Sequence, residues 1–371
     1  MSFSPSRLRL ARRRRRLTKV ELADRAQVAR ETLTRVENGE DPPSERFVER
    51  LAFALGFPPR FFHGGEVDLL AASDESTPER SVASFRSLRS LRARDREAAL
   101  AAGELAVLLT EEVNRRFRFP AANLPDDLAG TDPERAAELL RGLWGLGERP
   151  ISNMVHLLES KGVRVYWLVE DCHEVDAFMF WAGPLPFTVL STRKSGERGR
   201  MDAAQELGHL VLHRDGVLCG QAAEDQANTF GSAFLLPRDA FLRDLPRTPD
   251  LRRLLALKPR WGVSVAAMVR RAYGLGIYSE WQYKSAFIEL SRRGWRTGEP
   301  DPVAREESLA FTKVLEIMAQ KGQGVRELAE AIAVPEADVR ELIPVTTTRP
   351  PMDGSAPPTE DRIVGHLRVV R

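Results

Sequence analysis

The stretch "AAQELGHLVLH", residues 203–213, combines residue types that can carry out hydrolytic chemistry. In the helical motif H-E-x-x-H, two histidines one turn apart bind a zinc ion, and the glutamate between them is the general base. Glu206 and His209 stand at the positions of that glutamate and of the second histidine, whereas Gln205 stands at the position of the first histidine. The spacing therefore predicts a zinc-type site that lacks one ligand.

A catalytic zinc ion needs three protein ligands and an open position for water. In gluzincin-type proteases the third ligand is a glutamate from a following helix, and Glu224 in "EDQAN" fits that position. Asn228 lies one turn further on, where we expect it to orient the ligand side chains by hydrogen bonds without binding the metal itself. Because a glutamine amide oxygen is a poor zinc ligand compared with an imidazole, we expect zinc to be bound weakly or not at all.

Two other interpretations of this stretch stay open. Gln205 or a water molecule could complete a weakened metal site, and Glu206 would then act in a zinc-dependent metallo-endopeptidase. Alternatively, His209 and His213 are also four residues apart, so a site shifted by one turn is conceivable if Glu224 shifts with it. Without a metal, the pocket could still bind a peptide or a partner protein.

The elements that must hold these residues can be predicted from the surrounding pattern. Residues 163–171, 175–183 and 186–194 are short runs rich in β-branched and aromatic residues, which predict three strands. Residues 196–213 and 222–237 predict two helices separated by a glycine-containing break. We therefore expect the site on two consecutive helices that follow a small sheet.

The first 65 residues predict a basic bundle of five short helices. They contain 14 lysines and arginines against 8 acidic residues, an excess that indicates a polyanionic partner. Thr18 and Glu21 form a capping box, and Ser44 and Gly56 bound a later amphipathic helix. Two short helices joined by a tight turn have the geometry that enters a DNA major groove. We expect the arginine run at residues 12–16 to be partly solvated and partly in contact with phosphate.

Residues 17–56, "LTKVELADRAQVARETLTRVENGEDPPSERFVERLAFALG", resemble the XRE (Cro/repressor-like) helix-turn-helix family along their whole length. The resemblance implies that Lys19 contacts the phosphate backbone. It also implies that the outward side chains of the second helix contact DNA, with base-edge contact from Arg30, Glu31, Thr32 and Arg35 and a further contact from Thr34.

A second resemblance covers roughly residues 150–240. "DAFMFW", "AAQELGHLVLH" and "EDQANTFGSAFLLP" are similar to the ImmA/IrrE metallopeptidase family, whose fold is zincin-type. The flanking stretches "FRSLRS", "LKPRWGVSVAAMVRRA" and "RGWRTGEP" resemble long actinobacterial-type regulators that join such a domain to an XRE domain. The resemblance implies zinc as the cofactor of an intact site, which Gln205 puts in doubt here.

We therefore predict a mainly α-helical chain with a small β-sheet. It would comprise a helix-turn-helix bundle, an α+β gluzincin-like domain and a helical C-terminal region. The predicted boundaries are 1–65 for the DNA-binding domain, 66–84 for a linker, 85–150 for a helical connector, 151–240 for the peptidase-like domain, 241–343 for the C-terminal helices and 344–371 for a disordered tail.

The composition favours a cytoplasmic protein. The two cysteines, Cys172 and Cys219, are too few for a disulfide framework, which indicates a reducing compartment. No apolar run approaches the ~18 residues of a membrane span, so we expect no membrane partner.

From these features we expect a transcriptional regulator that binds double-stranded operator DNA as a homodimer on two half-sites. Its peptidase-like domain would be catalytically silent and would serve as a sensor or interaction module. Two alternatives remain: a weakly or conditionally active zinc metallopeptidase that cleaves a partner repressor, and an antitoxin or phage-immunity regulator that acts through protein contact.

Overall fold

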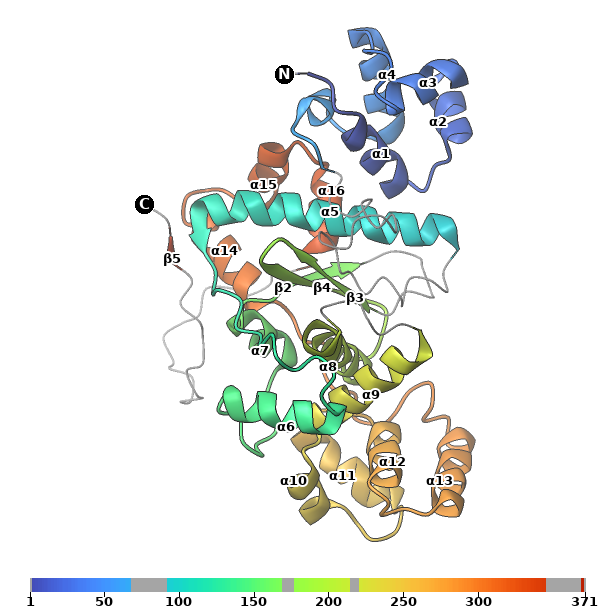
Figure 1. Ribbon diagram of the computed structural model, residues 1–371, viewed down its shortest axis with the longest axis vertical. Coiled ribbons are helices and arrows are strands. Elements are labelled where there is room, and N and C mark those ends of the chain that lie inside the picture. Colours follow the sequence, from blue (N-terminus) through green and yellow to red (C-terminus); the bar gives the residue numbers. More distant parts are fainter. Residues whose placement is uncertain (1, 68–91, 169–176, 214–219, 345–367, 370–371) are drawn as a thin grey trace.

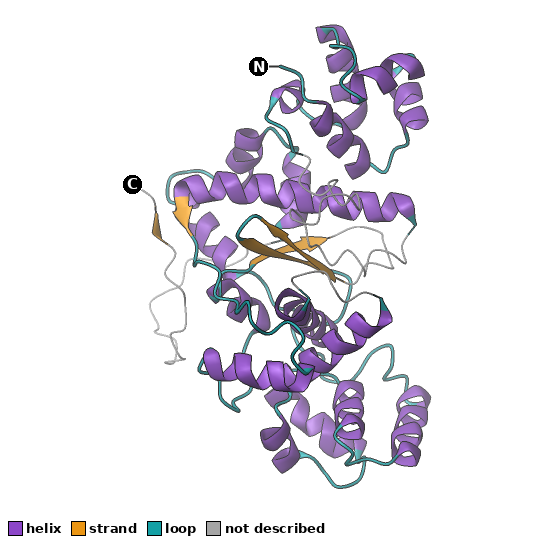
Figure 2. Cartoon of the chain, in the orientation of Figure 1, coloured by secondary structure: helices purple, strands orange, loops and turns teal. Residues whose placement is uncertain are grey.

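The computed structural model describes residues 2–67, 92–168, 177–213, 220–344 and 368–369. Figure 1 shows a bundle of short helices at one end, a long helix crossing beneath it, and then a three-stranded sheet. Further helices pack below the sheet and continue to a helical end opposite the bundle. Helix is the dominant structure (Figure 2), so the predicted class, mainly α with a small sheet, is confirmed.

The N-terminal bundle follows its sequence signals closely. It contains α1 (Pro5–Arg14), α2 (Lys19–Ala26), α3 (Arg30–Glu37), α4 (Glu45–Leu55) and a final 3-10 turn, η1 (Pro59–His63). The predicted capping box is present, because Thr18 and Glu21 satisfy each other's backbone amides at the start of α2. Ser44 caps α4, and Gly56 ends it in the left-handed conformation.

The long helix α5 (Ala93–Arg116) lies between the bundle and the sheet. Its middle, from Ala98 to Val113, is almost entirely buried because α1 covers one side and the sheet and C-terminal helices cover the others. Its C-terminal end continues into β1 (Phe117–Arg118), which pairs antiparallel with β5 (Arg368–Val369). The predicted disordered tail thus includes a paired two-residue strand at 368–369; residues 345–367 and 370–371 lie outside the described residues.

The three predicted strands form one sheet. β2 (Arg164–Leu168) runs parallel to β4 (Leu185–Ser191), and β3 (Ala177–Ala182) pairs antiparallel with the other edge of β4. Aromatic side chains on one face stack towards α5, with the rings of Phe180 and Phe187 4.8 Å apart. The opposite face packs on α8 (Gly196–Leu212) through Trp167, Met179 and Leu190. The sheet therefore separates two apolar cores, one shared with the bundle and one with the site helices.

The helices below the sheet are α6 (Pro133–Leu143), α7 (Met154–Ser160), α8, α9 (Gln221–Leu235), α10 (Arg238–Asp244), α11 (Leu251–Trp261), α12 (Val265–Gly274) and α13 (Glu280–Arg292). Asp132 caps α6 as its sequence predicts. The cap of α7 is Asn153, whose side chain accepts a hydrogen bond from His156 N.

The last helices return to the top of the molecule. α14 (Leu309–Ala319), α15 (Val325–Ile332) and α16 (Glu336–Leu342) pack around α5 and the sheet rather than forming a separate C-terminal unit. In the part of the chain that the structure describes, no helix combines the length and the apolar character that crossing a bilayer requires.

Some sequence predictions concern residues outside the described ranges. Most of the predicted linker, residues 68–84, is among them, as are Cys172 and Cys219. The first two linker residues are described and pack on α1: Val67 is buried and donates its backbone N–H to Ser6 Oγ at 3.1 Å, and Glu66 accepts from the same hydroxyl. The bundle therefore extends at least two residues past its predicted end.

Candidate functional site

Two glycines bring the site helices α8 and α9 into close contact. A Cβ atom added to Gly208 would lie 2.9 Å from Cδ1 of Phe230, and one added to Gly231 would lie 3.0 Å from the backbone nitrogen of Gln205. The first distance is shorter than real Cβ contacts and the second is tighter than most of them, so a larger residue at either position would force its neighbours to shift. The close crossing places the outward side chains of α8 directly against those of α9.

Gln205 is held by α9. Its side-chain amide donates a hydrogen bond to Asn228 Oδ1, and Asn228 Nδ2 donates to the backbone oxygen of Glu224 at 2.8 Å. The side chain that replaces the first histidine is thus tied to the predicted supporting residue. The structure brings Gln205, Asn228 and Glu224 together, as the motif spacing predicts, but through amide hydrogen bonds within the chain.

His209 lies at the centre of a hydrogen-bonded row. Its Nδ1 is 2.9 Å from Nδ1 of His213, whose Nε2 is 3.0 Å from Oε1 of Gln226. An amide oxygen can only accept, so His213 donates from Nε2 to Gln226. With both imidazoles neutral, His213 then accepts from the Nδ1–H of His209, and His209 Nε2, 3.5 Å from Glu224 Oε1, carries a lone pair.

Two donor atoms of the site have the separation that a zinc ion requires, but a third ligand is missing from the described ranges. Two ligands of a tetrahedral zinc, each about 2.0–2.2 Å from the metal, lie roughly 3.3–3.5 Å apart. The separation of His209 Nε2 and Glu224 Oε1 matches that geometry. Gln205 does not complete it, because its amide is bound to Asn228 and offers no imidazole nitrogen. No set of three or more histidine, cysteine, aspartate and glutamate side chains suited to a metal occurs among the described residues. The side chains present therefore do not fit a three-ligand catalytic zinc.

Glu206, the predicted general base, points into a crowded acidic environment. It is buried, and burial together with the nearby carboxylates of Glu224 and Asp202 raises the pKa of Glu206 well above its usual range. Asp202 is itself buried on α8 and is paired with Arg198 at 2.9 Å. A raised pKa favours the protonated carboxyl group, and only the ionised form can accept a proton from water.

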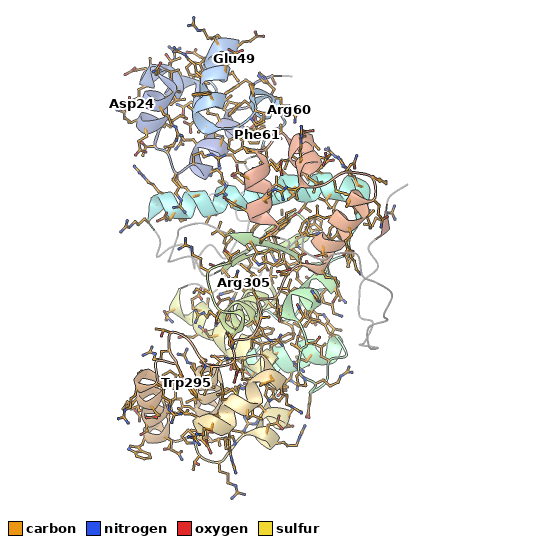
Figure 3. All side chains as sticks on the ribbon, turned by 180° about the vertical axis from the view of Figure 1, so that it is seen from behind. Asp24, Glu49, Arg60, Phe61, Trp295 and Arg305 are labelled. Carbon is orange, nitrogen blue, oxygen red and sulfur yellow. The ribbon has the colours of Figure 1, made fainter. Side chains whose placement is uncertain are left out.

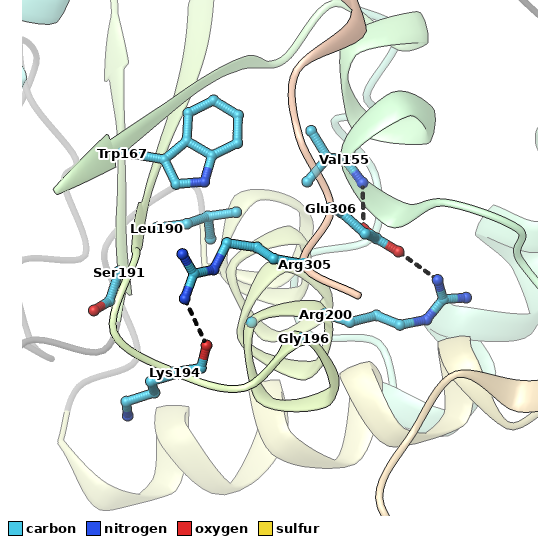
Figure 4. A pocket seen from close by; sticks show the side chains of 10 residues that line it. Val155, Trp167, Leu190, Ser191, Lys194, Gly196, Arg200, Arg305 and Glu306 are labelled. Carbon is cyan, nitrogen blue, oxygen red and sulfur yellow. Dashed lines mark hydrogen bonds and ion pairs between the residues drawn. The ribbon is translucent and has the colours of Figure 1, made fainter. Parts of the chain in front are cut away.

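The start of α8 is fixed by an extended segment, residues 299–308. Glu306 accepts from the backbone amides of Met154 and Val155 at the start of α7 and pairs with Arg200 of α8 at 2.5 Å (Figure 4). The small cavity beside it, lined by Trp167, Leu190 and Arg305 among others, holds about 20 Å³. That is room for roughly one water molecule, which is too small for a substrate. The contacts of Glu306 therefore serve to position α8.

The predicted DNA-reading residues lie on the free side of the bundle. Arg30, Glu31, Thr32 and Arg35 are exposed on α3, whereas Thr34 and Lys19 are half-buried. Arg35 is partly neutralised by Asp41, 2.9 Å away. The N-cap of α3 is Ala29, which forms no side-chain cap, so the first amides of the helix are open to an anion such as a phosphate. The arrangement suits a helix that enters a groove.

The arginine run is not a phosphate-binding stripe, contrary to the sequence-based expectation. Arg12 pairs with Glu37 inside the bundle, and Arg13 pairs with Glu104 of α5 at 2.7 Å. Arg14 and Arg15 both bind Asp338 of α16, at 2.9 and 2.7 Å. Arg16 lies 3.6 Å from Asp95 of α5. The run joins the bundle to the body of the protein, and a sequence pattern cannot reveal partners more than 300 residues away.

Comparison with known families finds one match in each of these two regions of the chain. Residues 6–60 match the helix-turn-helix domain family, and residues 159–273 match the family of the IrrE N-terminal-like domain. The chain joins a helix-turn-helix domain to an IrrE N-terminal-like domain. The predicted resemblance to such a fusion is confirmed. No curated protein matches the chain.

The IrrE N-terminal-like domain, as matched, runs from the end of α7 into α12 and so contains both site helices. It also includes α12, which packs against the domain because Arg271 binds Glu134 of α6 and donates to the backbone oxygen of Leu236 at 3.1 Å. The stretch "WGVSVAAMVRRAYGLG", which contains α12, is thus engaged in packing.

Sequence reasoning missed some members of the site. Gln226 orients His213, and Asp202 adds to the charge around Glu206, but neither belongs to the motif. The i, i+4 spacing of His209 and His213 was a usable signal for their contact. No comparable signal exists for Gln226, because the register between two crossing helices depends on their packing.

Proposed function

We propose that the protein is a cytoplasmic DNA-binding transcriptional regulator, in which α3 reads an operator and the IrrE N-terminal-like domain is catalytically silent. The observation that carries the proposal is the hydrogen bond from Gln205 to Asn228. It replaces the missing ligand position by a contact internal to the protein, while the exposed face of α3 is kept open. Together, these two features favour DNA binding over peptide hydrolysis as the function of the protein.

In this proposal the surface that α8 and α9 form around Gln205 serves recognition. Gln205, Asn228 and the half-exposed Glu224 present amide and carboxylate groups that can bind a peptide or small polar ligand by hydrogen bonds. The contacts of α1 with α5 and α16 join the DNA-binding bundle to the rest of the chain, so a change in the IrrE N-terminal-like domain could be transmitted to the bundle through them. We infer a sensor or interaction module that acts on operator binding, with the protein working as a homodimer on two half-sites.

Direct measurement of DNA binding tests the regulator. An operator is selected from a random duplex library with the full chain, and binding is then measured by fluorescence anisotropy. Arg30→Ala is expected to weaken binding to that operator by about 1–3 kcal/mol while leaving random duplex nearly unchanged. Lys19→Ala is expected to weaken binding to both duplexes and to reduce the salt dependence by about one ion. If the full chain selects no sequence and ignores duplex DNA at low salt, the proposal fails.

A second function is favoured by a specific observation. His209 Nε2 and Glu224 Oε1 have the separation of two ligands on one metal ion, and the row through His213 and Gln226 leaves a lone pair on His209 facing that space. This geometry supports a weakened metal site and hence a conditional metallopeptidase that cleaves a partner repressor. Peptidase activity in the zinc-supplemented wild type, abolished in His209→Ala, would favour this alternative over the silent domain.

A further inference from the structure

The outer face of α4 carries a stripe of four exposed residues, Arg46, Glu49, Arg50 and Phe53. They recur at the 3- and 4-residue spacing of one helical face, while the opposite face of α4 is buried in the bundle. Phe53 is 91% exposed, the highest value for a large apolar side chain among the described residues. Neither Arg46 nor Glu49 has an ion-pair partner within the described ranges, although each is an exposed charge on this face.

This stripe, here called the α4 stripe, is complementary to itself. In an antiparallel pair of α4 helices related by a two-fold axis between residues 49 and 50, Glu49 of each copy faces Arg50 of the other. The same register places Arg46 of each copy over the Phe53 ring of the other, a cation–π arrangement. Every contact then occurs twice, as an isologous interface requires, and like charges do not face each other.

We propose that the α4 stripe is the surface through which two copies of this chain associate. The inference rests on the proposed function, since a pair of helix-turn-helix domains on two half-sites needs a contact between them. It names a surface for that contact, and its occupant is a second copy of the same chain.

The position of α4 allows the pairing. Figure 1 shows α4 at the end of the molecule away from α5, and Figure 3 shows Glu49 at that end, with Arg60 and Phe61 on the side next to the C-terminal helices. The ionic contacts between the bundle and the rest of the chain use α1 and, through Glu21, α2, so pairing of α4 need not break them. Arg50 already donates one N–H to the backbone oxygen of Gln27 at 2.7 Å, which fixes its side chain and leaves other N–H groups for a partner. The reading face of α3 uses other residues.

The expected strength of the pairing follows from its size. An interface of one 11-residue helix from each copy is well below the roughly 1,200–2,000 Å² of a stable complex, so association in free solution is expected to be weak. Two adjacent half-sites would hold the copies at a high effective concentration and make the same contact effective on DNA.

Sedimentation of the full chain without DNA, over about 1 µM to 1 mM, tests the inference. The wild type is expected to dimerise reversibly in that range. Glu49→Arg replaces two attractive contacts by two repulsive ones and is expected to weaken dimerisation by about tenfold or more. In the double variant Glu49→Arg/Arg50→Glu both partners are reversed, so dimerisation is expected to return to within about threefold of wild type. Glu316→Arg, the same charge change at an exposed position of α14, is the matched control and is expected to change nothing.

Phe53→Ala is a second variant that leaves all charges in place, and its ring is so exposed that folding does not depend on it. It too is expected to weaken dimerisation. A wild type that stays monomeric throughout, or a double variant no better than Glu49→Arg, would overturn the inference. So would a dimer that only Trp281→Ala weakens, because Trp281 belongs to a separate exposed apolar surface on α13. A chain that binds its operator but never associates contradicts this inference and the homodimer, and leaves operator binding by α3 standing. One that dimerises but ignores DNA contradicts the proposed function.

Discussion

Gln205 on α8 donates its side-chain amide to Asn228 on α9, so the position of a metal ligand is occupied by a contact between the two site helices. The same crossing places His209 Nε2 3.5 Å from Glu224 Oε1, and the spacing of two ligands on one ion is therefore retained. The site thus keeps the helix crossing and two potential ligands, but has Gln205 where a histidine ligand is expected. A substitution at this one residue can therefore test what the site binds.

The close crossing of α8 and α9 predicts that Gly231→Ala is harmful. The added Cβ would lie 3.0 Å from the Gln205 nitrogen and 3.1 Å from its Cγ, so the facing backbone of α8 must give way by a few tenths of an ångström. We expect a loss of about 1–3 kcal/mol in the free energy of unfolding, measured by urea denaturation. Gly199→Ala in the neighbouring helix α8 is the control, since its Cβ would meet nothing within 4 Å, and it should be neutral or stabilising by up to about 1 kcal/mol. Equal effects of the two substitutions would mean that the crossing is looser than described.

The contact between the bundle and α16 predicts a second effect. Asp338 is buried and binds both Arg14 and Arg15, so Asp338→Ala removes the carboxylate of Arg15 and leaves Arg14 with Glu341. Breaking such buried pairs costs about 3–5 kcal/mol. After proteolytic cleavage within the predicted linker at residues 68–84, the wild-type bundle is expected to remain bound to the body in gel filtration, and the Asp338→Ala bundle to elute separately.

The control for that experiment is Glu336→Ala. Glu336 lies on the same helix but pairs only locally with Arg340, four residues on. It should leave the bundle bound. If the Asp338→Ala bundle also stays bound, the ionic contact does not hold the two parts together, and the apolar packing of α1 on α5 must be sufficient.

Glu159 predicts a dependence of stability on pH. Its carboxyl accepts from Ser308 Oγ and from the amides of Leu309 and Ala310 at the start of α14, and burial raises the pKa of Glu159 to about 7. A raised folded-state pKa means that the native protein holds a proton which the unfolded chain has lost. Stability from this group is therefore full below about pH 4.5 and is lost as pH rises to about 7.

Unfolding of wild type and Glu159→Gln at pH 5 and pH 8 measures this effect. The variant does not titrate, so the wild type should lose up to about 3 kcal/mol relative to it between the two values. A constant difference between the two proteins would show that the hydrogen bonds from α14 keep Glu159 ionised throughout.

Local features of the fold could be predicted from the sequence because their causes are local. Residues that are close in the sequence determine the capping box of Thr18 and Glu21, the Ser44 cap and the three apolar strands. The relation of His209 to Glu224 was also predictable, since motif spacing fixes one helix face and the family resemblance supplies the other.

What could not be predicted depends on segments that are distant in the chain. The arginines of α1 look like a DNA-binding run until Glu104 and Asp338 are seen beside them. The partner of His213 was equally hidden, because Gln226 meets it only through the register of two crossing helices. Such contacts are selected by tertiary packing, and a pattern read along the sequence carries no record of it.

Zinc content of the purified protein tests the central claim most directly. Wild type and Gln205→His are loaded with zinc and passed over a desalting column, and their zinc content is measured by inductively coupled plasma mass spectrometry. The double variant Gln205→His/His209→Ala is the control for specific binding. We expect well under one zinc per wild-type chain, about one per Gln205→His chain with an affinity higher by roughly two orders of magnitude or more, and loss of that zinc in the control. One tightly held zinc per wild-type chain, lost in His209→Ala or Glu224→Ala, would contradict the silent domain.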